Sequence, residues 1–289
     1  MSGDLDRRLH AFRPDLAETA LRGKVEAERF VEGEPARLIA PLADIRPRPD
    51  PSAGIDSQIL YGETVRVFDR QEGWAWIKCD ADDYVGYVSD AALVSGQGEA
   101  THIVTTPRTF LYPGPDLKFP VAAALSMGSR LDVVGDTVTR DTRYLLLESG
   151  EAVIASHCRP LDGAADGDAV AVATLFLQTP YLWGGRSGFG IDCSGLVQTA
   201  FAMTGYAAPR DSDMQAKWLG SAIDPERDGL QRGDLVFWKG HVGFIEDDGK
   251  TLLHASGGTM TVTREPLAGA IARIAALYGP PTGYRRVFA

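Results

Sequence analysis

The chain has 289 residues, a length that favours two or three domains with cores large enough to fold without disulfide staples. Hydrophobic residues make up 44% and charged residues 24%, which excludes a disordered or a fibrous chain. The formal net charge of −10 repels phosphate backbones and anionic lipid, so we expect neither nucleic acid nor a membrane as a partner.

The cysteines and the N-terminus indicate where the protein works. The three cysteines, Cys79, Cys158 and Cys193, are odd in number and lack a metal-like spacing, so we expect neither a disulfide framework nor a zinc site. The first residues mix acids and bases without the apolar run of a signal peptide, and no stretch approaches the ~18 apolar residues of a membrane span. We therefore expect a cytoplasmic protein.

The N-terminal part reads as an arm followed by short strands. Residues 1–34 form the expected arm, in which Asp15 caps a short helix over residues 16–22 that Gly23 ends. Strands are then expected over residues 36–39, 64–68, 74–79 and 85–88, with a long loop over residues 47–54, and again over residues 103–105, 131–134, 144–147 and 152–154. Short strands at close spacing predict two small all-β barrels, over residues 35–96 and, in degenerate form, 97–160.

The first predicted barrel carries a recognisable set of motifs. They are Leu60-Tyr61-Gly62-Glu63, Glu72-Gly73-Trp74-Ala75-Trp76 and Tyr84-Val85-Gly86-Tyr87-Val88. The set resembles the bacterial SH3-like domains that accompany cell-wall enzymes. The alternative for Trp74 and Tyr87 is that they only fill the barrel core, because aromatic residues suit a half-buried pleated surface.

A third domain is expected over residues 161–289, and it carries a candidate nucleophile. After a linker at 162–168 and a helix over 169–178, Asp192 is suited to cap a helix that runs to Gly205. Cys193 then lies in the first turn, where the helix dipole and a nearby imidazolium can lower a thiol pKa toward ~3.5–7.5. The alternative is that Cys193 is a small buried hydrophobic residue.

Two histidines lie on neighbouring strands of a predicted hairpin. Asp248-Gly249 separates two β-prone runs and indicates a two-residue turn. Pairing residue 247 with residue 250 sets Gly243 opposite His254 and places His241 diagonally on the same face, at a backbone separation of roughly 7–8 Å. Gly243 leaves room between the imidazoles. One histidine can therefore take the thiol proton while the other orients it.

The third domain as a whole resembles the NlpC-type papain-like cysteine peptidases of bacterial cell walls. The blocks that carry the resemblance are, in order, Pro180-Tyr-Leu-Trp-Gly-Gly185, Asp192-Cys-Ser-Gly-Leu-Val197, Arg232-Gly-Asp-Leu-Val-Phe-Trp238, His241-Val-Gly-Phe-Ile245 and Leu253-His-Ala-Ser256. The resemblance implies an α+β papain-like domain with Cys193 as nucleophile, His241 as base and then acid, and His254 as the orienting residue. It further implies that the Tyr181 hydroxyl serves the oxyanion and that Asp192, Ser194 and Ser212 bind the N-terminal residue of the substrate.

The two barrels, the arm and the missing signal peptide resemble the subgroup that recycles cell-wall peptides, the γ-D-glutamyl-L-diamino acid endopeptidases. This implies hydrolysis of free L-Ala-γ-D-Glu-diamino acid peptides, with no cofactor, a small murein peptide as the only partner and no obligate protein partner. Glu63 and Tyr84 of the first barrel are expected to receive the substrate ammonium group. Two alternatives stay open, a papain-like acyltransferase or amidase and a noncatalytic wall-binding protein, as does the choice between diaminopimelate and lysine.

Overall fold

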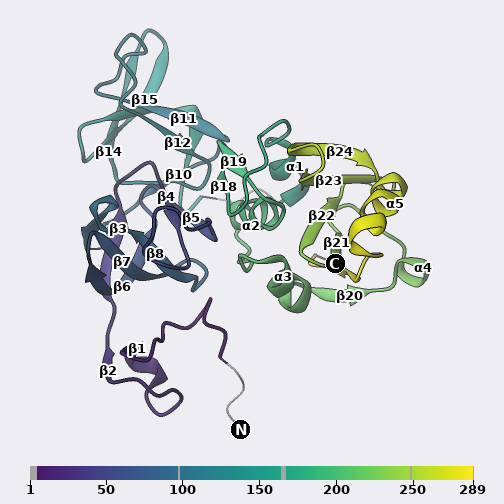
Figure 1. The fold of residues 1–289 in the computed structure, drawn as a ribbon. Helices are drawn as coiled ribbons and strands as arrows, with labels where there is room; N and C mark the ends of the chain where they lie inside the picture. Colours follow the sequence, from purple (N-terminus) through teal and green to yellow (C-terminus); the bar gives the residue numbers. More distant parts are fainter. Residues whose placement is uncertain (1–4, 97, 164–166, 248, 289) are drawn as a thin grey trace. The chain divides into compact units, whose positions relative to one another are not determined.

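The computed structural model describes residues 5–96, 98–163, 167–247 and 249–288 (Figure 1). Contacts within the chain define two compact units, Met1–Gly163 and Ala164–Ala289. The finer boundaries at residues 34/35 and 96/97 stay predictions. Within the described ranges, no helix is both long and apolar enough to cross a membrane.

The N-terminal arm is extended, so the helix predicted over residues 16–22 is wrong. Strand β1 (Leu16–Glu18) pairs in parallel with β2 (Arg29–Val31), and a short 3-10 turn, η1 (Thr19–Leu21), follows β1. The Asp15 carboxylate accepts hydrogen bonds from the Arg13 guanidinium. Leu16 is fully buried in a cluster with Trp76. Tertiary packing of Leu16 has therefore overridden the local helix propensity.

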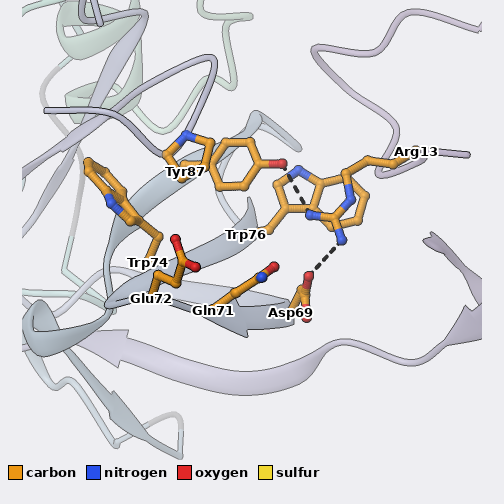
Figure 2. A pocket seen from close by; sticks show the side chains of 8 residues that line it. Arg13, Asp69, Gln71, Glu72, Trp74, Trp76 and Tyr87 are labelled. Carbon is orange, nitrogen blue, oxygen red and sulfur yellow. Dashed lines mark hydrogen bonds and ion pairs between the residues drawn. The ribbon is translucent and has the colours of Figure 1, made fainter. Parts of the chain in front are cut away.

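The guanidinium of Arg13 links the arm to the first group of strands. Figure 2 shows Arg13 lying over the ring of Trp76, 4.4 Å from its centroid. The guanidinium donates to the Tyr87 hydroxyl at 3.1 Å and pairs with Asp69 at 2.6 Å. These contacts form one end of a cavity of about 160 Å³ whose opposite wall includes Trp74. A stacked and ion-paired arginine of this kind gives the arm a fixed attachment point.

The first group contains the four predicted strands and three that were not predicted. It comprises β3 (Glu34–Leu38), β4 (Leu42–Ile45), β5 (Ser57–Leu60), β6 (Thr64–Gln71), β7 (Trp74–Cys79), β8 (Val85–Ser89) and β9 (Leu93–Ser95), with a 3-10 turn η2 (Asp90–Ala92); β4, β5 and β9 are the three that were not predicted. Five of them form a sheet in the order β8-β7-β6-β3-β9, and β4 pairs with β5 alone. Tyr84 lies in the apolar core that these strands enclose.

The second group of strands forms two further sheets. It comprises β10 (His102–Val104), β11 (Arg108–Tyr112), β12 (Ala123–Ser126), β13 (Arg130–Leu131), β14 (Val133–Thr139), β15 (Thr142–Leu147), β16 (Ala152–Ile154) and β17 (Cys158–Pro160), with a 3-10 turn η3 (Ala155–His157). The sheets run β12-β11-β16-β15-β14 and β13-β10-β17. A separate core of seven buried apolar residues fills this group.

Over the residues that the structure describes, neither group closes into a barrel, so the two predicted barrels are not confirmed. In the first group, β4–β5 meets the larger sheet through an isolated bridge between Arg46 and Tyr87. In the second, the strand predicted over residues 131–134 is interrupted at Asp132, and its two halves join different sheets. Short strands separated by loops can satisfy their hydrogen bonds in pairs and leave a sheet open.

The C-terminal unit is α+β, as predicted. Its strands are β18 (Arg186–Ser187), β19 (Gly190–Ile191), β20 (Ser221–Ile223), β21 (Leu235–Trp238), β22 (His241–Ile245), β23 (Thr251–Ser256), β24 (Thr261–Pro266) and β25 (Gly283–Arg286); its helices are α1 (Ala169–Thr174), α2 (Cys193–Met203), α3 (Ser212–Trp218), α4 (Pro225–Asp228) and α5 (Leu267–Tyr278). The main sheet is antiparallel, in the order β20-β25-β21-β22-β23-β24. Helix α1 ends four residues earlier than predicted, and the backbone reverses at Gln178, whose φ is 68°.

Two helices cover opposite faces of this sheet. Phe244 of β22 contacts Phe201 of α2, with ring centroids 5.6 Å apart. The next residue, Ile245, points the other way and packs with Leu267 and Ile274 of α5. Because side chains alternate along a strand, His241 and His254 lie on the same face as Ile245, toward α5.

Candidate active site

Cys193 occupies the first position of α2, as the sequence predicts. Asp192 is the N-cap in an extended conformation, and its carboxylate accepts a hydrogen bond of 2.7 Å from the Gly195 N–H. Cys193 is 6% exposed. The backbone N–H groups of Val242 and Ser194 donate to its sulfur. The sulfur is thereby held between the start of α2 and the start of β22, which carries His241.

A buried ion pair holds the loop in front of Cys193. The Arg210 guanidinium, 1% exposed, binds the Asp192 carboxylate with both terminal nitrogens, at 2.7 and 3.0 Å. The same carboxylate accepts from the Gly184 N–H at 2.9 Å, and Arg210 also donates to the Ser194 hydroxyl at 3.0 Å. A methyl group at Gly195 would lie 2.3 Å from the Gly185 oxygen, so glycine is required for this close approach.

Asp192 and Ser194, two residues expected to bind substrate, already use their side-chain oxygens in hydrogen bonds of this network. The Asp192 oxygens accept from the Gly184 and Gly195 N–H groups, Arg210 and the Ser194 hydroxyl, and Arg210 offsets the carboxylate charge. Asp192 and Ser194 are therefore engaged in ordering the turn. Ser212 is the first residue of α3 and is half-buried. Substrate binding by these three residues stays a prediction.

The two histidines meet as the predicted hairpin register requires. Strands β22 and β23 pair Phe244 with Leu253 and Ile245 with Leu252. His241 Nε2 lies 2.8 Å from His254 Nδ1, so the two imidazoles share a hydrogen bond. A methyl group at Gly243 would lie 2.9 Å from the His254 Cβ, which shows why glycine separates them. Asp248 of the predicted turn lies outside the described residues.

The hydrogen-bonded chain continues beyond the two histidines. His254 Nε2 lies 2.8 Å from Glu265 Oε1 on β24, and the same oxygen pairs with Arg273 on α5. Neither Glu265 nor Arg273 was predicted, and neither was Arg210. Each comes from a segment whose register or packing had no sequence signature. On the other side of the pair, the Trp238 ring centroid lies 5.6 Å from that of His241.

The site is electrically neutral at its reacting atoms, which overturns the expectation of a depressed thiol pKa. Burial, with a smaller contribution from the Asp192 charge, raises the pKa of the Cys193 thiol to about 12. Burial lowers the pKa of His241 to about 3 and that of His254 to about 4. The free-energy cost of desolvating a thiolate exceeds the stabilisation that the N-terminus of α2 gives to it. At neutral pH the resting site therefore holds a thiol and two neutral imidazoles.

Tyr181 is close enough to this site to be influenced by it. Burial raises the pKa of its hydroxyl, and the charge of Asp192, as well as that of Cys193 once it is ionised, acts in the same direction. Its backbone N–H donates to the Met260 oxygen at 2.8 Å, which ties the segment before α2 to the turn between β23 and β24. The hydroxyl stays protonated at neutral pH and can donate a hydrogen bond.

The two candidate residues of the N-terminal unit are buried within it. Glu63 is 8% exposed, and its carboxylate accepts a hydrogen bond of 2.8 Å from the Leu60 N–H. Tyr84 is 3% exposed. Their expected role toward the substrate ammonium stays a prediction. Within the described part of the chain, no three His, Cys, Asp or Glu side chains are grouped so as to hold a metal ion.

The buried imidazoles make the stability of the protein depend on pH. His254 is 1% exposed and neutral in the folded state down to about pH 4, whereas an unfolded histidine titrates near 6.5. The unfolded chain binds the extra proton in this window, so stability is complete above pH 6.5 and falls toward pH 4, by up to about 1.4 kcal/mol per pH unit for one histidine. Urea unfolding of the full chain across this range measures the slope. His254→Gln should flatten it, and an unchanged slope would contradict the assignment.

Comparison with known proteins gives two family matches. The model of the bacterial dipeptidyl-peptidase SH3 domain matches residues 45–93. The model of the NlpC/P60 family matches residues 178–274, the segment that contains Cys193, His241 and His254.

Several named proteins are similar in sequence over most of this chain. A γ-D-glutamyl-L-lysine dipeptidyl-peptidase of Bacillus cereus is 30% identical over 220 residues, which cover 69% of this chain and 63% of that protein. Dipeptidyl-peptidase 6 of Lysinibacillus sphaericus is 30% identical over 244 residues, 77% of this chain and 88% of that protein. The matched segment thus spans less than two thirds of the first relative and most of the second.

A solved structure shares the fold. The crystal structure of an NlpC/P60 family protein from Bacillus cereus matches with a TM-score of 0.73 and 25% identity, covering 89% of this chain and 100% of that one. An NlpC/P60 endopeptidase from Photobacterium damselae matches with a TM-score of 0.60 at 15% identity, which bears on the fold alone.

Proposed function

Because the chain belongs to the NlpC/P60 family of cell-wall peptidases, we propose that it hydrolyses the bond between γ-D-glutamate and a diamino acid in free L-Ala-γ-D-Glu peptides. The observation that carries the proposal is the hydrogen bond of 2.8 Å between His241 and His254 beside a cysteine that begins a helix. The substrate class follows the relatives, whose names specify a γ-D-glutamyl-L-lysine bond.

The neutral resting site determines the order of events. The Cys193 sulfur attacks the γ-carbonyl carbon as its proton passes to His241, and the Tyr181 hydroxyl and the Cys193 N–H stabilise the oxyanion. The resulting imidazolium gives its proton to the leaving amine as the C–N bond breaks. Water then loses a proton to His241 and attacks the thioester, and the C–S bond breaks with return of the proton to sulfur. The cycle consumes one water molecule and needs no cofactor.

Transfer of the thiol proton during attack has a clear advantage in a buried site. A preformed thiolate-imidazolium pair would be two charges in an apolar environment, which is costly unless both are fully hydrogen-bonded. Burial raises the pKa of the Cys193 thiol and lowers that of His241, so it disfavours the charged form of each group. Substrate binding must therefore supply the stabilisation that makes the charged state accessible.

We further propose that the enzyme acts in the cytoplasm on peptides already released from the wall. The match of residues 45–93 to the SH3 domain of bacterial dipeptidyl-peptidases supports the choice of a free peptide. A substrate ammonium group then needs a carboxylate partner, since an unpaired buried charge is expensive. Glu63 is the partner we propose, with Tyr84 as a second residue that receives the ammonium group.

The test compares free and blocked peptides. The full chain is incubated with L-Ala-γ-D-Glu-diaminopimelate or its lysine counterpart, and products are identified by mass spectrometry. Acetylating the alanine amine, or attaching it to muramic acid, is expected to lower kcat/KM by roughly 100-fold or more, because about 3 kcal/mol of charge pairing is lost.

Of the diaminopimelate and lysine peptides, the one that is cleaved faster identifies the preferred diamino acid. Glu63→Gln serves as the matched variant, and it should raise KM for the free-amine peptide but leave the blocked peptide unaffected. Equal rates for free and blocked peptides would contradict the recycling assignment, and absence of Ala-Glu product would contradict the proposed bond.

A further inference from the structure

The histidine pair ends in a carboxylate that is itself held in place. Glu265 Oε1 is hydrogen-bonded to His254 Nε2 at 2.8 Å and also pairs with the guanidinium of Arg273. The Glu265 side chain is 22% exposed and that of His254 1%, so their contact is shielded from water on the histidine side. A methyl group at Gly258 would lie 3.1 Å from an Arg273 nitrogen, so the turn after β23 leaves room for the guanidinium.

We propose that Glu265, fixed by Arg273, is a positioning residue that sets the protonation pattern of both histidines and leaves the Nδ1 atom of His241 as the free base. This inference rests on the proposed peptidase function and extends the site by two residues. It concerns this chain's own side chains and requires no ligand beyond the substrate.

The pattern follows from the donors and acceptors in the chain of contacts. A carboxylate only accepts, so the proton between Glu265 and His254 belongs to His254 Nε2. A neutral imidazole carries one N–H, which makes His254 Nδ1 an acceptor. The hydrogen bond at that atom must then come from His241 Nε2, and the remaining nitrogen of His241 keeps its lone pair. One carboxylate therefore determines two tautomers in sequence.

The charges of Glu265 and Arg273 change the imidazole pKa values in opposite directions. Glu265 raises the pKa of His241, whereas Arg273 lowers the pKa of both His241 and His254. His241 is also acted on by His254, which lowers its pKa, and by Asp192, which raises it. Glu265 thus favours the imidazolium of His241 that forms during attack, and Arg273 disfavours it.

Three variants separate geometry from charge. Glu265→Ala removes both the acceptor and its charge, and we expect kcat to fall roughly 10- to 100-fold with KM changed less than about threefold, because an orienting group acts through the base. In Glu265→Gln the amide oxygen can still accept from both His254 and Arg273, so kcat should fall less than tenfold. Arg273→Gln keeps the carboxylate and removes the opposing charge.

The pH profile gives a readout that a purely structural residue would not move. The acid limb of kcat/KM reports the imidazoles of the free enzyme. It should shift to lower pH in Glu265→Gln and to higher pH in Arg273→Gln. Glu246→Gln is the matched control. Glu246 directly follows β22 and pairs with Arg264, the residue next to Glu265, so this substitution removes a similar charge close to Glu265 in the sequence of β24. Its acid limb should stay in place.

Nitrogen-15 spectra of the imidazoles test the pattern without turnover. At neutral pH the full chain should show protonated Nε2 and unprotonated Nδ1 on both His241 and His254, with assignments from His241→Gln and His254→Gln. Glu265→Ala should give mixed tautomers and Glu265→Gln should restore the single pattern. A protonated Nδ1 on His241 in the parent chain, or acid limbs that shift in the same direction in both charge variants, would overturn the proposal.

The spectra also distinguish this proposal from the proposed function. If the parent chain shows the expected tautomers but cleaves neither tripeptide, the proposed function fails while the positioning of the histidines stands. If it cleaves the tripeptide and Glu265→Ala retains full kcat with a normal melting temperature, the positioning role fails while the function stands.

Discussion

Replacing Cys193 by alanine is expected to lower kcat for the tripeptide by about 10⁴-fold or more while leaving the fold intact. The sulfur is the atom that forms the thioester, so nothing else in the site can replace it. The backbone geometry should survive, because the cap hydrogen bonds come from Asp192 and the substitution removes one buried atom. Steady-state kinetics by mass spectrometry, together with thermal unfolding, measure both parts of the expectation.

The other two cysteines supply the controls. Cys79 lies in the core of the first group of strands, and Cys158 packs against the core of the second. Alanine at either position should cost about 1–2 kcal/mol of stability through the lost packing and leave kcat per folded molecule unchanged. Retained turnover in Cys193→Ala, or its loss in Cys79→Ala at full folding, would contradict the assignment of the nucleophile.

Replacing Arg210 by methionine is expected to destabilise the C-terminal unit by about 3–5 kcal/mol, because it leaves the Asp192 carboxylate buried without its counter-charge. Both nitrogens of the guanidinium face that carboxylate, and the side chain is 1% exposed. Activity per folded molecule should also fall, since the same contacts order the turn that presents Cys193. Urea unfolding and kinetics at a temperature well below the transition measure the two effects separately.

A second ion pair in the same unit is the matched control. Arg286 binds Asp234 at 2.7 and 2.8 Å, and Asp234 is 1% exposed. Arg286→Met should destabilise the unit but leave kcat per folded molecule close to that of the parent. Combining Arg210→Met with Asp192→Asn should recover part of the lost stability, because the unpaired charge is removed. A double variant no more stable than Arg210→Met would show that Asp192 carries no uncompensated charge.

The sequence predicted those features that depend on neighbours along the chain. The capped helix at Cys193 follows from Asp192 and its local hydrogen bond, and the meeting of His241 with His254 follows from strand alternation across a short turn. Each needs a single element or a single hairpin. Periodicity and turn chemistry are enough to specify such local geometry.

The features that the sequence did not predict depend on distant partners. The arm is extended because Leu16 packs with Trp76, sixty residues away in the chain. Arg210 and Glu265 gain their roles from Asp192 and His254, and neither pairing has a fixed spacing. The pKa of the Cys193 thiol was expected to fall because the residue begins a helix, but burial of the thiol raises it instead. Burial and long-range pairing emerge only once the sheet and helices are assembled.

The uncharged state of Cys193 has a consequence for how the protein meets reactive molecules. Alkylating agents and peroxide attack a thiolate, and burial raises the pKa of the Cys193 thiol so that the thiol form predominates at pH 7. The free protein should therefore resist iodoacetamide and oxidation to the sulfenic acid far better than a cysteine peptidase with a resting ion pair. Inhibitors that rely on a pre-ionised sulfur will be slow, and compounds that first fill the substrate cleft and carry an electrophilic carbonyl will be favoured.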